Sequence, residues 1–219
     1  GAGAPPAAPY NPRVDIVSLG QARRIADARC RQAFGSKVFF DVETYYDEQD
    51  LPSVYVFVYR EPGRPEEPKA ELFKRLAAAE DAFQEAQALI VDGGRDGNHS
   101  KVLEGRRRGH EALKALHLRD TYYSVYVSAS RTHMPTIEWR QDLPQSYTTR
   151  RAAEGALRKA GARSDAAVRF HYLGPLDMVV SAEEGPSPSG PAQAGAAKNR
   201  RVYVDPAAGP RPLEQAEFE

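Results

Sequence analysis

The chain has 219 residues, in which 30 Lys and Arg balance 30 Asp and Glu, and this length fits one domain with appendages or two small ones. The formal net charge of +0 creates no overall field toward nucleic acid or an anionic membrane surface. The single cysteine, Cys30, excludes an internal disulfide and a cysteine-rich metal site. No apolar run approaches the roughly 18 residues of a membrane-spanning helix. The composition therefore predicts neither nucleic-acid binding nor a transmembrane segment.

Residues 1–13 are rich in alanine and proline and are predicted to form an extended arm, because proline fixes φ and removes a backbone donor. The sequence begins at Gly1 without a methionine, and this start resembles the spacer that follows a cleaved signal peptide. We therefore expect an exported protein, secreted or periplasmic; a remnant of cloning is the alternative. An arm of this composition is expected to lie against a partner, with Tyr10 as a contact residue.

Residues 14–182 carry the patterns of an α+β domain. Ser18–Phe34 is predicted to be an amphipathic helix, because Ser18 is a suitable N-cap, apolar residues recur near one face and Gly35 can end the helix. Cys30 falls near that apolar face. We expect it to pack as a small hydrophobic residue and not to act as a reactive thiol.

Two strands are expected next, at Lys37–Tyr46 and Ser53–Glu61, joined by a turn-rich link. Their valines alternate largely with aromatic residues, so the valine faces should point to a helix-covered core and the aromatic faces should be partly covered as well. Asp41 and Glu43 share one strand face, as the paired carboxylates of a hydrolase would. Their neighbours give no burial signal, and we expect a solvated face there.

An antiparallel helical hairpin is predicted to interrupt the strands at residues 65–119. Its first arm carries mostly acidic residues and its second arm mostly basic ones, and this opposite imbalance is expected to help fix the pairing of the two helices. The tip, Asp92–Ser100, offers oxygen ligands of the type that Ca²⁺ uses but lacks the EF-hand spacing. Gly and Asn also make ordinary tight turns, and we expect such a turn at the tip.

Tyr122–Gln141 is predicted to be a β-hairpin, since it alternates with a period of two on both sides of a break at Arg131–Pro135. We expect it to pair back to the strand at Ser53–Glu61. The break would then be a loop at the end of the sheet and a candidate contact surface for a protein partner. The candidate contact residues in it are Arg131, His133 and Met134.

A helix is expected at Tyr147–Ala160, capped by Ser146 or Thr148, with strands at Ala166–Leu173 and Met178–Ala182. Residues 183–199 read as a low-complexity linker. Residues 200–219 contain a short strand and a tail, and this strand could pair with its own sheet or with that of a neighbour. Its candidate partner-binding residues are Val202, Tyr203 and Val204.

A search for chemistry finds no nucleophile elbow, phosphate loop, zinc-protease motif or Cys-x-x-Cys pair. His110 and His117 lie seven residues apart on one predicted helix, and a third ligand could complete a zinc site, but surface groups are the preferred interpretation. We therefore expect no catalytic residue, no metal and no cofactor, so the chain is predicted not to be an enzyme.

Several stretches resemble propeptide domains of the streptopain and PepSY types. They are the helix rhythm AxxIAxxxC at residues 22–30, the strands VFFDVETYYDEQDLPSVYVFVYR at residues 38–60, and the later YYSVYVSASRTHMPTIEW and RRVYVDPAAG. The resemblance covers Ser18–Arg60 and Tyr122–Pro206, and the helical hairpin interrupts it. It implies a small α+β fold that covers a protease cleft, assists folding or simply binds.

Together these patterns predict an antiparallel sheet of about six or seven strands packed on two helices, with the helical hairpin inserted. The functional hypothesis is a non-catalytic, exported binding or structural subunit of an extracellular or envelope assembly. It would contact a protein partner, either a different protein or copies of itself, through its extended termini. The alternatives are a propeptide-like protease inhibitor or folding chaperone, and an enzyme with an unrecognised site.

Overall fold

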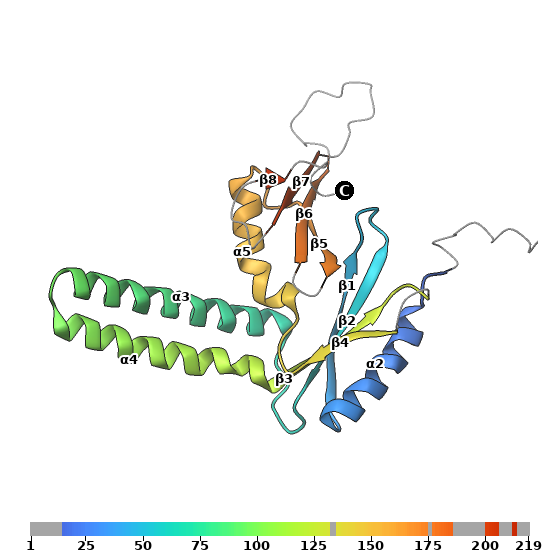
Figure 1. The fold of residues 1–219 in the computed structure, drawn as a ribbon, viewed down its shortest axis with the longest axis horizontal. Helices are drawn as coiled ribbons and strands as arrows, with labels where there is room; N and C mark the ends of the chain where they lie inside the picture. Colours follow the sequence, from blue (N-terminus) through green and yellow to red (C-terminus); the bar gives the residue numbers. More distant parts are fainter. Residues whose placement is uncertain (1–14, 132–134, 175–176, 186–199, 206–211, 214–219) are drawn as a thin grey trace, which may run out of the picture.

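The computed structural model describes residues 15–131, 135–174, 177–185, 200–205 and 212–213. The strands are β1 (Val38–Tyr46), β2 (Pro52–Arg60), β3 (Tyr122–Ser128), β4 (Thr136–Arg140), β5 (Ala167–Gly174), β6 (Asp177–Glu184), β7 (Arg200–Val204) and β8 (Pro212–Leu213). The helices are α2 (Leu19–Phe34), α3 (Lys69–Arg95), α4 (His99–Leu116), α5 (Gln145–Lys159) and the short 3₁₀ helix η1 (His117–Thr121). The strands form one sheet in the order β4-β3-β2-β1-β5-β6-β7-β8 (Figure 1). The predicted α+β fold is confirmed.

The sheet consists of two antiparallel halves that meet at one point. Strands β4 to β1 form the first half and β5 to β8 the second. Between the halves, β1 and β5 run parallel and are paired only at Tyr46 and His171, and Figure 1 shows the second half set apart from the first. The sheet is therefore mixed at this one pairing. The expected pairing of the Tyr122–Gln141 hairpin with the strand before the insertion is confirmed, because β2 pairs with β3 along its length.

Polar contacts reinforce the joint between the two halves. Nδ1 of the buried His171 lies 3.0 Å from the backbone oxygen of Asp47, and Nε2 lies 2.8 Å from Oγ of Ser181. Burial lowers the pKa of His171, which favours the neutral ring. Because a carbonyl only accepts, Nδ1 carries the proton and Nε2 accepts from the serine hydroxyl. Asp50, in the β1–β2 turn, forms ion pairs with Arg169 and Arg201 of the second half.

Helix α2 covers one face of the first half. Ser18 caps it in a reciprocal capping box with Gln21, and Gly35 ends it with a φ of 80°, as the sequence predicts. Cys30 is buried on its inner face, and burial raises the pKa of its thiol to about 11. The inner face of α2 packs on the aromatic side of β2, which includes Tyr55, Phe57 and Tyr59. The aromatic face is therefore covered, as predicted.

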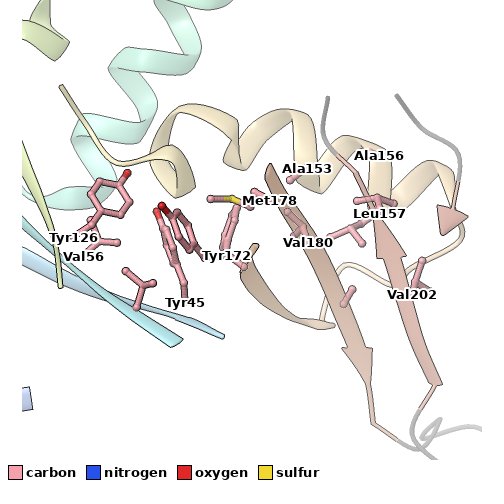
Figure 2. Close-up of a cluster of buried hydrophobic side chains, with 14 residues drawn as sticks. Tyr45, Val56, Tyr126, Ala153, Ala156, Leu157, Tyr172, Met178, Val180 and Val202 are labelled. Atoms are coloured by element: carbon pink, nitrogen blue, oxygen red, sulfur yellow. The ribbon is translucent and has the colours of Figure 1, made fainter. Parts of the chain in front are cut away.

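Helix α5 covers the other face of the sheet and spans both halves. Its apolar residues Ala153, Ala156 and Leu157 pack in a core with side chains from both halves, among them Tyr45 and Tyr172 (Figure 2). The prediction that Ser146 or Thr148 caps this helix is wrong, because the N-cap is Pro144. The Tyr45 hydroxyl instead donates to Oγ of Ser146 at 2.8 Å, so this serine anchors a buried tyrosine to the helix.

The hairpin of α3 and α4 projects away from the sheet (Figure 1), and the two helices contact each other through glycine and alanine. A Cβ atom on Gly105 would lie 2.8 Å from Cγ1 of Ile90 and 2.9 Å from the backbone oxygen of Ala86. A Cβ atom on Gly93 would likewise lie 2.9 Å from Cγ2 of Val102. Glycine at these positions lets the helices approach closely.

The expectation that opposite charges fix the pairing of the two arms is wrong. In the described part of the chain, the ion pairs of α4 stay within α4, as between Arg107 and Glu104, except for Lys101 with Asp96 at the tip. Asp81 of the acidic arm pairs with Arg151 of α5 at 2.6 Å. Oppositely charged residues three or four positions apart on one helix are close enough to form ion pairs with each other. The charged residues of α4 therefore do not require partners on α3.

The C-terminal strand belongs to the same sheet. β7 pairs antiparallel with β6, and β8 pairs with the outer side of β7. Val202, Tyr203 and Val204 are buried, so their assignment as partner-binding residues is corrected: they pack inside this chain. The predicted linker at residues 183–199 also begins too early, because β6 continues to Glu184, and residues 186–199 lie outside the described residues.

Candidate protein-binding surface

Strand β4 forms the outer edge of the first half of the sheet. It pairs antiparallel with β3, with Trp139 opposite Val125 and Glu138 opposite Tyr126. Among the described residues, no strand pairs with its other side. An edge strand of this kind presents unpaired N–H and C=O groups, to which an extended segment of another chain can add.

Two large apolar side chains stand half-exposed on β4. The exposed fraction is 37% for Ile137 and 43% for Trp139. A register shift between Tyr126 and Val127 places Ile137 at a β-bulge. Trp139 lies on the α2 face, because Val125 opposite it belongs to the core beneath α2. The guanidinium of Arg29 on α2 lies 4.3 Å from the centroid of the Trp139 ring. Tryptophan and arginine are enriched in the energetically important parts of protein interfaces.

The opposite face of β4 carries two charges. Nη2 of Arg140 donates to the buried Tyr126 hydroxyl at 2.8 Å, and Nε of Arg140 lies 3.8 Å from Glu138. Burial raises the pKa of the Glu138 carboxyl, while Arg140 and the Tyr172 hydroxyl oppose that shift. The strand thus carries Trp139 on one face and two opposite charges on the other.

The predicted contact residues lie partly at this edge. Arg131, in the segment that connects β3 to β4, is exposed, and its Nη2 lies 3.3 Å from Oε1 of Gln21. Tyr10, His133 and Met134 lie outside the described residues.

Sequence reasoning missed Ile137 and Trp139 as surface residues. Their alternation looks the same in an edge strand and in a central strand, since it records only which side chains share a face. The sequence did contain one indication of a special role for Trp139. It is the only tryptophan, and it lies on the last strand before a predicted helix.

The carboxylates of Asp41 and Glu43 do not lie on a solvated face, so that expectation is wrong. A register shift between Phe39 and Asp41 marks a β-bulge, which turns both carboxylates toward α5. Nζ of Lys69 lies 2.6 Å from Asp41 and 2.7 Å from Glu43, and their side chains are 23% and 11% exposed. The hydroxyl of Tyr147 donates to Asp41. Both acids are thus held in ion pairs and hydrogen bonds.

Other polar groups that the sequence singled out have structural partners. At the hairpin tip, Asn98 caps α4 by accepting from the backbone N–H of Lys101, and Asp92 pairs with Arg95 at 2.7 Å. The described residues contain no group of three or more His, Cys, Asp or Glu side chains placed to hold a metal ion. None of the described helices is both long and apolar enough to cross a bilayer.

Comparison with known proteins gives no relative, since no family model, curated protein or solved structure matches this chain. The resemblance to propeptide domains therefore stays a prediction.

Proposed function

We propose that this chain is a non-catalytic binding subunit of an exported assembly, and that it binds a protein partner along the outer edge of β4. The single observation that carries the proposal is the half-exposed pair Ile137 and Trp139 on the outermost strand of the first half-sheet. An added strand would hydrogen-bond to the free edge and cover both side chains, which supplies backbone affinity and an apolar anchor together.

The surrounding residues suit such a contact. Arg29 stacks on Trp139 and holds the ring against α2, so the anchor is positioned before a partner binds. Arg131 lies where the chain enters the segment leading to β4, and its polar side chain would border the apolar pair. The expected contribution of the extended arm, Tyr10 included, and the export of the chain remain predictions that accompany this proposal.

Site-specific photo-crosslinking tests the proposal. A photoreactive amino acid replaces Ile137 in the full chain, which is produced in its native host and irradiated. A covalent adduct to a protein is expected at position 137 because the partner strand would lie against this side chain. The matched control is Val91, an apolar residue on the projecting α3 that is 65% exposed. Absence of an adduct at position 137, or equal labelling at both positions, would contradict the proposal.

A further inference from the structure

The order of residues along β4 identifies the kind of partner that fits its edge. Glu138, Trp139 and Arg140 place an acidic residue, an aromatic residue and a basic residue in succession. We propose that the partner at this edge is a second copy of the chain, joined by antiparallel pairing of β4 with β4 across a two-fold axis at Trp139. This inference rests on the proposed function, because it names the partner of the same edge.

Two-fold symmetry makes this pairing self-complementary. When Trp139 lies opposite Trp139 of the second copy, Glu138 of each copy lies opposite Arg140 of the other. In an isologous contact each of these pairs forms twice. Residues of opposite sign that face each other across two strands stabilise the pairing, whereas residues of like sign in those positions destabilise it. Parallel pairing in the same register would place Glu138 opposite Glu138, so the charge order selects the antiparallel arrangement.

Both charged side chains are partly exposed in a single copy. Glu138 and Arg140 are 23% and 33% exposed, and at 3.8 Å their contact is longer than a hydrogen bond. An acidic side chain arriving from a facing strand would find an arginine that is already held in place by the Tyr126 hydroxyl.

The apolar face leads to the same arrangement. The Trp139 side chains of the two copies would lie next to each other on the α2 side of the joined sheet and would cover part of each other's exposed surface. Edge strands that avoid pairing commonly carry lysine, proline or a β-bulge. The five residues of β4, Thr136–Arg140, contain neither lysine nor proline, and the bulge lies at Ile137, outside the regular segment Glu138–Arg140 that would pair. The two charges of β4 are complementary to those of another copy and therefore do not prevent the two strands from pairing.

Charge exchange tests the pairing. The full chain is expected to sediment as a dimer of twice 24.1 kDa. Glu138→Arg or Arg140→Glu alone would place like charges opposite each other twice and should weaken the dimer by at least about tenfold. The double variant restores opposite charges in exchanged positions and should recover it. Arg158→Glu, at an exposed position of α5, makes the same charge change as Arg140→Glu away from the edge and should leave the dimer intact.

Two further variants guard against effects of folding and define the register. Ile137→Lys changes a side chain that is 37% exposed and should give a folded monomer. Trp139→Cys should form a disulfide-linked dimer on oxidation, because residues directly opposite have Cβ atoms close enough for a disulfide, whereas Thr136→Cys should not. The native Cys30 is buried and therefore does not compete.

The outcomes separate this inference from the proposed function. A monomeric wild-type chain, or a double charge variant no more dimeric than the single ones, would overturn the second-copy proposal. Photo-crosslinking at position 137 to a protein other than this chain, with a monomeric wild type, would retain the proposed function and reject self-pairing. An adduct of twice the chain mass at position 137 would support both.

Discussion

The sheet and the projecting hairpin of this protein are packed by opposite means. The sheet buries large side chains, and Tyr45, Phe57 and Tyr126 are among its largest fully buried residues. The hairpin of α3 and α4 buries Gly105 and Gly109 at the contact between its helices. In the sheet, side-chain volume fills the space between strands and helices. In the hairpin, the absence of side chains lets two backbones approach.

Because of this difference, the two regions are expected to respond to changes in side-chain volume in opposite directions. Removing volume should damage the sheet, because its core would be left with a cavity. Adding volume should damage the hairpin, because a close-packed helix contact has no space to accept it.

Tyr45→Ala should produce the largest loss of stability. Tyr45 is fully buried between the two halves of the sheet and donates a hydrogen bond to Ser146. Truncation of a large buried aromatic residue costs about 3–5 kcal/mol in the free energy of unfolding. Urea denaturation followed by far-ultraviolet circular dichroism and by the fluorescence of Trp139 measures the loss. Tyr46→Ala is the control, because Tyr46 is only partly buried, and an equal loss in both variants would contradict the role given to Tyr45.

Gly105→Ala should destabilise the protein by about 1–3 kcal/mol, because the added methyl group would meet Ile90 and the backbone of Ala86. Gly155→Ala makes the same change in the middle of α5, where no heavy atom lies within 4 Å of the new Cβ. Alanine favours a helix over glycine, so this control should stabilise by about 0.5–1 kcal/mol. If both variants gain stability, the hairpin is not packed as tightly as its glycines indicate.

Acidification should loosen the joint between the two halves of the sheet through His171. Burial lowers the pKa of this histidine below its ordinary value of 6.5, so the unfolded chain binds the proton more readily than the folded one. Its contribution to stability is therefore complete above about pH 6.5 and is lost as the pH falls through the lowered folded value. Urea midpoints measured at several pH values should show this slope. His171→Gln should remove it, and His110→Gln, at an exposed position of α4, should keep it.

The sequence predicted the local elements well, because their signals are local. Ser18 and Gly35 mark the ends of α2, and they act as N-cap and C-cap in the structure. The alternation at Tyr122–Ser128 and Thr136–Arg140 correctly predicted a β-hairpin. The insertion at residues 65–119 was correctly predicted to form two antiparallel helices. Steric and hydrogen-bonding preferences within a few residues are sufficient for such predictions.

The errors concern choices among distant partners. A bulge after Phe39 reversed the direction of Asp41 and Glu43, and a bulge depends on the neighbouring strand. The charged residues of α4 could form ion pairs with α3 or within α4 itself, and sequence spacing alone did not distinguish these two possibilities. The candidate surface was missed for the same reason, because Trp139 is exposed only as a result of the order of strands in the sheet.

Periodicity and capping act along the chain, so they are sufficient to predict which stretches form helices and strands and which of their faces are apolar. Long-range packing places β4 at the edge of the sheet, buries Val202–Val204 inside the chain, and joins the two half-sheets at Tyr46 and His171. These outcomes depend on which elements bury each other's apolar surface, and that competition is settled between residues far apart in the sequence.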